Sequence, residues 1–379
     1  MKATKLMLSA CMAALALVSC NKVETDDIQR GSLKSVELAL SNVQFVTKAA
    51  GGAEIADGQS VMVSSFQVFF TDGTNIYSGK TEDGADIDAY YSADATSGTI
   101  AELTTAQAYH FLPDAVNKVI VVGNLAKIEN PSSIADINRA VYAKDQQDQT
   151  KLTLYAESTF TETGKHVENP DGHSAILYTA NCNLLPLIAR LEVKSAGITF
   201  GSTPLFDKVE FDKLIFADYY GEANLMTGAK SNLFTVDLTN DVTAFNYINS
   251  VTDGFWDNDD VTLTALPTQT AEQNTVATNL SYSFFPNENV GPVLILSAVA
   301  TAAGSSTSAP AYVYTSQFKH GENILLPTAE DGHKGFKPGY IYRVESFNFS
   351  EDKLNHQEKC IDVTVTVDTW KVVAVTPIF

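Results

Sequence analysis

The feature that most constrains this chain is its last stretch, residues 360–379, which reads CIDVTVTVDTWKVVAVTPIF. Valines alternate here with threonine and aspartate, and this period of two lines one face of a β-strand with apolar side chains. The alternating valines are Val363, Val365 and Val367, and the apolar run after Trp370 contains Val372, Val373 and Val375. Because a chain end is usually frayed unless something holds it, we expect this stretch to pair with another strand. It is either the final strand of its own sandwich or a strand that enters a groove on another copy.

The opposite end has the pattern of a bacterial lipoprotein precursor. Lys2 and Lys5 form a basic segment, and the apolar residues 6–18 are too few to span a bilayer as a permanent helix. The apolar segment ends in LVSC, a lipobox in which the signal peptidase would cut before Cys20 and the Cys20 thiol would carry lipid. An ordinary signal peptide with a chance cysteine is the alternative. One lipid group with its acyl chains anchors a protein without a spanning helix, so we expect an outer-membrane lipoprotein.

Residues 21–29 include three acidic side chains and resemble the export tag that sends lipoproteins of Bacteroides-like bacteria to the cell surface. A solvated tether is the simpler interpretation, and it is compatible with that role. We therefore expect the lipidated precursor to reach the cell surface.

The remaining cysteines give no sign of a metal centre. Cys182 and Cys360 are solitary, and the six histidines form no close pair around a carboxylate, whereas a metal site needs several ligands at suitable spacing. The acidic run 257–260 lacks the alternating ligands of a calcium-binding EF-hand loop. Two cysteines in an exported chain form one disulfide or stay as buried thiols, and the residues do not decide between these. We predict no metal and no cofactor.

Length and composition favour two domains rich in β-structure. The 379 residues suffice for two domains, and a hydrophobic content of 45% supports real cores. The formal net charge of −20 argues against nucleic acid as a partner. Short β-prone runs with turn signals recur, among them the buried-strand candidate 118–124, and helical periodicity is rare. We predict two tandem β-sandwich domains with one or two short helices, the best of which begins near Ser133 with Asp136 in a capping box.

The first strand candidate, residues 35–46, has two sets of alternating apolar side chains. Val36, Leu38 and Leu40 share one face, and after a slip near residues 41–42 the alternation continues at Val43 and Phe45. A β-bulge would explain the slip. The small residues 47–52 that follow have the composition of an exposed loop that a protease can cut.

Taken together, the order and spacing of several short motifs resemble the fimbrillins of the Bacteroidales, the subunits of type V pili, over nearly the whole chain. The motifs are the lipobox, the strand that ends in TKA at 47–49, the apolar run 119–124 followed by a helix, IARLEV at 188–193, KSNLF at 230–234, FPNEN at 285–289, YIYRV at 340–344 and a last strand that carries Trp370. Each motif is short and apolar, so the likeness rests on their order.

This resemblance implies two transthyretin-like β-sandwich domains and a route to polymerisation. In such precursors an extra first strand fills a groove in the N-terminal domain. A surface protease cuts after a basic residue in the next loop, the strand leaves, and the C-terminal strand of another subunit takes its place. The implied parts are a signal peptide at 1–19, a lipidated tether with the removable strand at 20–48, an N-terminal domain at 49–183 and a C-terminal domain at 184–379 that ends in the donor strand 361–379.

In this chain the resemblance places the cut between Lys48 and Ala49. The displaced strand would carry Val36, Leu38, Leu40, Val43 and Phe45, and the donor would carry the valines and the tryptophan of the last stretch. Well-known members of the family are cut after arginine, whereas the matching residue here is lysine, so the identity of the protease stays open. The expected partners are other copies of the chain, related pilus subunits, the processing protease and, through lipid in the precursor, the outer membrane.

We expect a structural subunit of a surface pilus that serves adhesion, most directly a stalk subunit, and no enzyme. The sequence contains no G-x-S-x-G, H-E-x-x-H, G-x-G-x-x-G or P-loop motif. Two alternatives stay open. A chain that remains uncut would be a non-polymerising anchor subunit, and a glycan-binding surface lipoprotein would expose aromatic pairs such as 90–91, 219–220 or 255–256.

Overall fold

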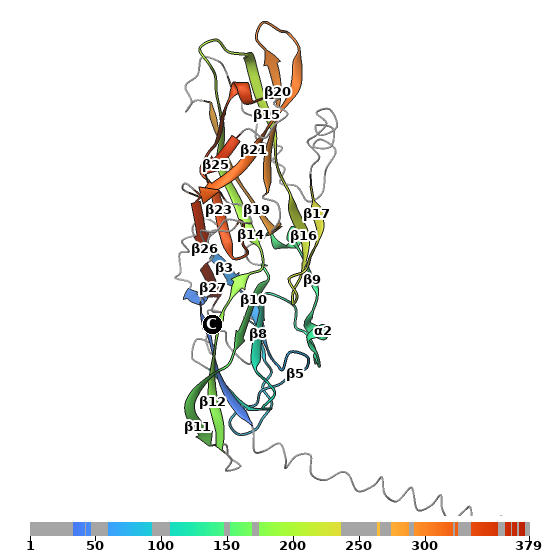
Figure 1. Cartoon of the computed structure of the whole chain (residues 1–379), viewed down its shortest axis with the longest axis vertical. Coiled ribbons are helices and arrows are strands. Elements are labelled where there is room, and N and C mark those ends of the chain that lie inside the picture. Colours follow the sequence, from blue (N-terminus) through green and yellow to red (C-terminus); the bar gives the residue numbers. More distant parts are fainter. Residues whose placement is uncertain are drawn as a thin grey trace, which may run out of the picture.

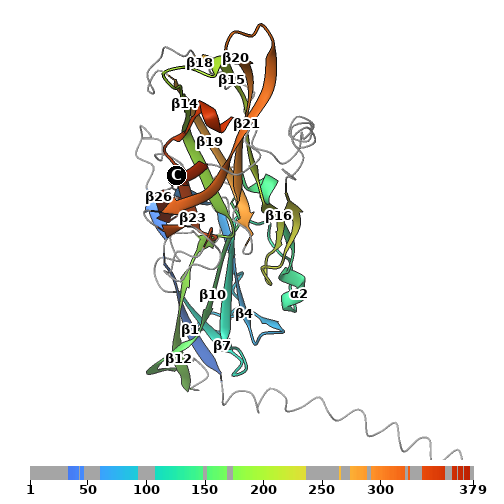
Figure 2. The ribbon, with the colours of Figure 1, turned by 45° about the horizontal axis from the view of Figure 1, so that its top comes forward.

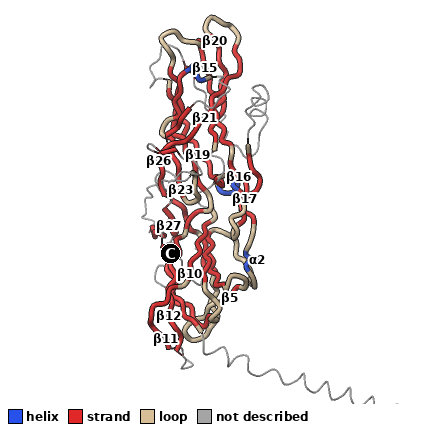
Figure 3. The backbone as a smooth tube through the Cα atoms, in the orientation of Figure 1, coloured by secondary structure: helices blue, strands red, loops and turns tan. Residues whose placement is uncertain are grey.

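The computed structural model describes residues 33–41, 43–46, 60–92, 107–147, 152–168, 174–235, 264–265, 274–287, 292–320, 323–324, 335–354, 361–364, 366–369 and 371–375. The molecule is elongated and mostly β, as the strand colouring of Figure 3 makes plain. In this part of the chain the α-helical structure is a single short helix, α2 (Ile134–Ile137), accompanied by the 3-10 turns η3 (Ala143–Gln146) and η4 (Glu351–Lys353). The predicted fold class, mostly β with short helices, is confirmed.

The first half of the chain supplies the strands at the lower end of the molecule in Figure 1. These strands are β1 (Lys34–Ser41), β2 (Val43–Val46), β3 (Ser60–Val63), β4 (Ser65–Thr71), β5 (Ile76–Tyr77), β6 (Tyr90–Ser92), β7 (Gln107–Leu112), β8 (Lys118–Gly123), β9 (Ala140–Tyr142), β10 (Leu154–Thr159), β11 (Thr161–Glu168), β12 (Ser174–Asn183) and β13 (Leu185–Pro186). Most of them form two sheets, with strand orders β11-β12-β1-β7 and β13-β10-β8-β4-β5, and β6 pairs with β4. Strands β2 and β3 belong to a three-stranded sheet with a strand from the end of the chain, and β9 pairs with a strand of the second half.

The second half builds the upper end. Its strands are β14 (Ala189–Thr199), β15 (Phe206–Ala217), β16 (Tyr219–Asn224), β17 (Lys230–Phe234), β18 (Thr264–Ala265), β19 (Thr275–Pro286), β20 (Val293–Ala302), β21 (Ser308–His320), β22 (Asn323–Ile324), β23 (Tyr340–Val344), β24 (Phe347–Ser350), β25 (Ile361–Thr364), β26 (Thr366–Thr369) and β27 (Lys371–Val375). One sheet has the order β17-β16-β19-β14-β23-β26, with β24 beside β14, and another has the order β18-β15-β20-β21-β22, with β25 beside β21.

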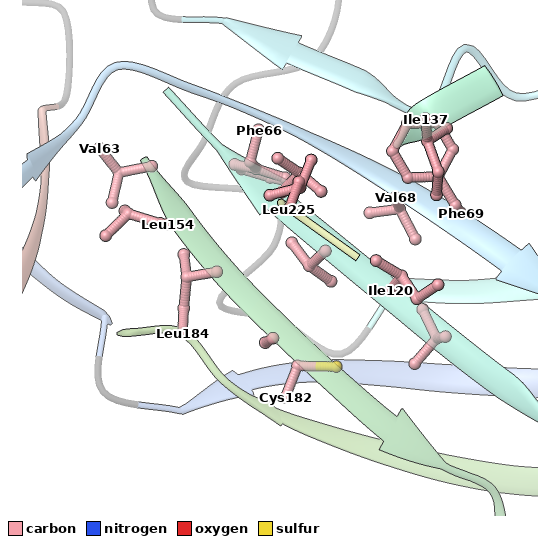
Figure 4. Packing of buried hydrophobic residues seen from close by; sticks show 14 of the residues in the cluster. Val63, Phe66, Val68, Phe69, Ile120, Ile137, Leu154, Cys182, Leu184 and Leu225 are labelled. Carbon is pink, nitrogen blue, oxygen red and sulfur yellow. The ribbon is translucent and has the colours of Figure 1, made fainter. Parts of the chain in front are cut away.

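Buried apolar side chains form two clusters. The first gathers mainly residues 36–188, including Leu184 and Ile188, and the second gathers residues 189–354. In the first cluster, Val63, Leu154 and Leu184 lie together at one end (Figure 4). The boundary at 183/184 stays a prediction, because side chains on both sides of it pack in the first cluster.

Two central strands explain why the first cluster forms. All seven residues of β4 are buried, and five of the six residues of β8, the predicted buried strand, are buried as well. Strands covered on both faces read as continuous apolar runs rather than as alternation. The continuous apolar sequence KVIVVG therefore indicates a strand in the middle of a sheet.

The expected capping box opens α2. The Asp136 carboxylate accepts hydrogen bonds from the backbone and the hydroxyl groups of Ser132 and Ser133. These bonds lower the pKa of Asp136 to about 2. The helix is only four residues long, because Asn138 already has an extended backbone.

The two halves are joined by more than the chain connection. Strand β9 of the first half pairs with β16 of the second. The side chain of Gln147 also donates to the carbonyl oxygen of Ser283 at 2.8 Å and accepts from the Ser283 backbone N–H at 2.9 Å. These bonds fix the upper sheets against the first half, on the side where α2 lies in Figure 2.

Replacing Gln147 with alanine removes both hydrogen bonds to Ser283. Each net hydrogen bond contributes about 0.5–1.5 kcal/mol, so we expect Gln147→Ala to lower the free energy of unfolding by about 1–3 kcal/mol. Urea unfolding followed by circular dichroism measures this loss. The control is Asp145→Ala, which changes a nearby exposed side chain and should alter the free energy of unfolding by less than about 0.5 kcal/mol. Equal effects of the two variants would show that the hydrogen bonds between Gln147 and Ser283 contribute nothing.

Candidate functional site

Strand β1 lies in the middle of its sheet, between two strands from later parts of the chain. It pairs in parallel with β12 over its full length, from Lys34 opposite Ile176 to Ser41 opposite Asn183. On its other side it pairs antiparallel with β7, with Glu37 opposite Ala108. We call the gap between β12 and β7 that this strand fills the β1 slot. A strand in this position satisfies two backbone ladders at once.

The alternating apolar side chains of β1 enter the first core. Val36 and Leu38 are both 0% exposed, and Leu40 is partly buried against the same cluster. The side chains of Tyr109 on β7 and of Ala180 and Cys182 on β12 are also buried there. The predicted inward face of the first strand therefore coincides with the face that fills the core.

The beginning of β1 is held by polar contacts as well. The Ser35 hydroxyl is buried and lies 2.9 Å from Nδ1 of His110. Burial lowers the pKa of His110 below its ordinary value, because desolvation disfavours the charged ring. The Lys34 ammonium group donates to the backbone carbonyl oxygens of Asp114 and Val116 and forms an ion pair with the Asp114 carboxylate.

One wall of the β1 slot is tightly packed around Tyr109. Its hydroxyl lies 3.0 Å from the hydroxyl of Tyr91, and its ring packs on Phe70 with the centroids 4.8 Å apart. A Cβ atom at Gly79 would lie only 2.7 Å from the Tyr109 side chain, so glycine is required for this close approach. This wall is built by residues outside β1, which means that the shape of the slot does not depend on β1 alone.

The second part of the predicted first strand belongs to a different sheet. After Asn42, β2 leaves the β1 sheet and pairs in parallel with β27, with Val43 opposite Val372 and Phe45 opposite Ala374. The structure thus divides the single bulged strand expected from the sequence into two strands. The slip in the apolar alternation marks the point where the chain changes sheets rather than a bulge within one sheet.

The last stretch is docked on its own chain in three pieces. Strand β25 pairs in parallel with β21, β26 pairs antiparallel with β23, and β27 lies between β2 and β3, parallel to both. Figure 1 shows β27 close to β3, at mid-height of the molecule. The expectation that this stretch pairs with another strand is met here by strands of both halves.

The predicted site residues fall into two groups. The described ones are Val36, Leu38 and Leu40 in β1, Val43 and Phe45 in β2, Val363 in β25, Val367 in β26 and Val372, Val373 and Val375 in β27. Cys20, Lys48, Ala49, Val365 and Trp370 lie outside the described residues. The proposed cut would nevertheless fall in the connection between β2 and β3, which flank β27 on opposite sides.

Other candidate sites from the sequence contribute little. Cys182 is buried in the first core, and burial raises the pKa of its thiol to about 12, while Cys360 lies outside the described residues. Of the aromatic pairs that a glycan site would expose, Tyr91 and Tyr219 are buried and 255–256 are not described. Among the described residues, no group of three or more His, Cys, Asp or Glu side chains could hold a metal ion. Within the same residues, no helix has the length and apolar character needed to cross a membrane.

No protein-family model matches the chain, and no curated protein matches it significantly. A candidate cell adhesion protein of solved structure from Parabacteroides distasonis ATCC 8503 matches 91% of this chain and 98% of its own, with 13% identity and a TM-score of 0.50. A candidate cell adhesion protein from Bacteroides eggerthii DSM 20697 matches over the same shares, with 14% identity and a TM-score of 0.45. A fimbrilin from Porphyromonas gingivalis W83 matches 90% of this chain and 98% of its own, with 9% identity and a TM-score of 0.42. The match to the Parabacteroides distasonis protein shows a likeness of fold.

Truncating Leu38 should test how much the buried face of β1 stabilises the uncut chain. Removing a fully buried leucine side chain costs about 2–5 kcal/mol, so we expect Leu38→Ala to lower the free energy of unfolding by that amount. Its neighbour Glu37 is only half-buried, and Glu37→Ala should cost less than about 0.5 kcal/mol. Chemical denaturation of the two variants measures the difference, and a loss below 1 kcal/mol for Leu38→Ala would contradict tight packing of β1.

The burial of His110 predicts that the uncut chain loses stability in weak acid. Its folded pKa lies below the ordinary value of 6.5, so the unfolded chain binds more protons and stability falls as the pH drops below about 6.5. The variant His110→Asn keeps a polar side chain beside Ser35 but removes the titration. We expect a smaller loss of melting temperature between pH 7 and pH 5 in this variant, and parallel curves for variant and parent would contradict the assignment.

Proposed function

We propose that this protein is a structural, non-catalytic subunit of a cell-surface pilus and that its subunits join by strand exchange. A protease removes the N-terminal segment, which contains β1 and β2 and ends before the cut at Lys48. The last stretch of another copy then fills the β1 slot. The observation that carries this proposal is the position of β1, a central strand in the core that is separated from the predicted cutting loop only by the short strand β2.

Loss of β1 would leave an unstable surface on both sides of the β1 slot. The facing edges of β12 and β7 would expose their N–H and C=O groups, and such edges readily pair with another strand. The cavities left by Val36 and Leu38 add apolar surface, since burying each such side chain contributes about 1.5–3 kcal/mol. A donated strand restores both the ladders and the apolar contacts by β-augmentation.

The cut changes which strand fills the β1 slot. As long as β1 belongs to the same chain, its high effective concentration favours it over any strand of another molecule. Once the connection is severed, β1 can diffuse away. Every donor strand, by contrast, remains attached to a folded subunit. Exchange therefore proceeds after cleavage and is suppressed before it.

The same cut would also loosen the donor. Strand β27 has two parallel neighbours in the uncut chain, and β2 is one of them. When β2 leaves together with β1, β27 keeps only β3 as a partner. One proteolytic cut would thus empty the β1 slot and also weaken the pairing that holds β27 in its own chain. The opening of the acceptor slot and the release of the donor strand are therefore coupled.

The location of the subunit follows from its expected processing. The precursor would be held in the outer membrane by lipid on Cys20 and displayed at the cell surface, and cleavage after Lys48 would separate the assembled pilus from that lipid. Proteins of similar fold are described as candidate cell adhesion proteins and as a fimbrilin. Adhesion by an extracellular pilus of identical and related subunits is the role we propose for this chain.

Substituting Lys48 should block assembly at its first step. We expect Lys48→Gln to leave the lipidated precursor intact and monomeric, because β1 stays tethered in its slot. The parent should begin at Ala49 and form multimers that survive in an unboiled denaturing gel. N-terminal sequencing of protein sheared from the cells, read beside that gel, measures both properties.

The control for this experiment is Arg30→Gln, which changes a basic residue upstream of β1 and should assemble normally. Cleavage at Arg30 would leave β1 attached to the subunit. If the parent itself keeps a lipidated Cys20 and remains monomeric, the stalk role is wrong. The chain would then be an anchor subunit or a glycan-binding surface lipoprotein.

A further inference from the structure

We propose that the donated stretch enters the β1 slot in one fixed register, in which Val363, Val365 and Val367 take the places of Val36, Leu38 and Leu40. This inference rests on the proposed strand exchange and specifies its geometry. In this register Thr364 of one copy lies where Glu37 lies in the uncut chain, opposite Ala108 of the other copy.

The sequence pattern of the two segments carries the inference. In the first segment apolar residues alternate, skip a pair of polar residues, and resume at Val43 and Phe45. The last stretch alternates in the same way, skips Asp368 and Thr369, and resumes at Trp370 and Val372. The slip follows Leu40 in the first segment and Val367 in the last stretch. Since a shift by one residue would turn every side chain to the opposite face, this shared slip identifies one alignment.

The backbone of the structure divides both segments at the same place. Strand β1 ends at Ser41 and β2 begins at Val43, while β26 ends at Thr369 and β27 begins at Lys371. In the proposed alignment these two breaks coincide to within one residue. In both segments the strand after this break belongs to a different sheet from the strand before it. The last stretch has a further break between β25 and β26 in the uncut chain, but its break before β27 matches the one between β1 and β2.

The polar position at the start of the slot agrees with this register. Ser35 is buried and its hydroxyl lies 2.9 Å from Nδ1 of His110. The residue that takes its place is Asp362, whose carboxylate can accept a hydrogen bond from the same ring. A buried imidazole needs such a partner, because an unmatched polar group in the core is costly. The register thus places a side-chain oxygen beside Nδ1 of His110, as Ser35 does in the uncut chain.

Shifts by two residues keep the same face inward but fit less well. A shift in one direction places Thr369 at the position of Leu40 and Trp370 at that of Ser41. A shift in the other direction places Asp368 at the position of Val43. The proposed alignment alone among these three gives an apolar residue at all five apolar positions of the first segment. Register in a sheet with one buried face is strongly specified by this kind of pattern.

Paired cysteines can report the register in assembled pili. We would combine Ala108→Cys with Thr364→Cys in full-length chains that also carry Cys360→Ser, shear the pili from the cells and oxidise them. Residues directly opposite in an antiparallel pair have Cβ atoms about 4.5–5.5 Å apart, close enough for a disulfide. In a single chain β7 and β25 belong to different sheets, so a bond between these positions must join two copies. We expect dimers and longer multimers that persist on boiling and disappear on reduction.

Two matched controls replace Thr364→Cys with Asp362→Cys or Thr366→Cys, which lie two residues away on the same face of the strand. Diagonal positions are about 7–8 Å apart, too far for an unstrained disulfide, so both should cross-link at least tenfold less. A further control combines Glu37→Cys with Ala108→Cys in the uncut Lys48→Gln chain. These two cysteines should form a disulfide within one molecule, which would show that position 108 tolerates cysteine.

The outcomes separate the register from the proposed function. Pili that assemble but cross-link best through position 362 or 366 would overturn the register while leaving strand exchange intact. Pili that assemble with no cross-link at any of the three donor positions would show that the last stretch does not fill the β1 slot. Failure of the Cys360→Ser parent to form multimers would overturn both.

Discussion

The double backbone ladder of β1 is the interaction on which the rest of this structure depends. One strand from the beginning of the chain lies between β12 and β7 and holds them in one sheet. Its side chains at Val36 and Leu38 fill the centre of the first core. The walls of the slot come from other residues, such as Tyr109 packed on Phe70, and the proposed exchange requires that they keep their shape when β1 leaves.

The three-stranded sheet β2-β27-β3 links this central strand to the end of the chain. It brings together the end of the first segment, the strand after the predicted cutting loop and the last described strand. In the proposed mechanism, a cut between β2 and β3 would act at a position where the donor and the removable segment are hydrogen-bonded neighbours. The junction between the halves, through β9 and Gln147, would hold the two halves together while one strand is exchanged.

The sequence predicts local structure well and long-range pairing poorly. The alternation at Val36, Leu38 and Leu40 identifies the buried face of β1, and the run at 118–124 identifies a central strand, because both patterns depend only on neighbouring residues. The sequence does not show that residues 35–46 divide between two sheets, nor that the last stretch pairs with its own chain as three separate strands. Those features depend on β12, β21 and β23, whose pairing with distant segments leaves no local periodicity to read. Here the resemblance in motif order pointed to the correct fold.

Hydrogen exchange of the backbone amides in β7 and β12 tests the central claim most directly. It would be measured in the uncut chain, in the cut chain kept dilute before assembly, and in sheared pili. The account predicts slow exchange in the uncut chain, fast exchange after release of β1, and slow exchange again in the pili, because the two ladders are closed, open and closed in turn. Equally slow exchange in all three forms would contradict it, since the slot would then never have opened.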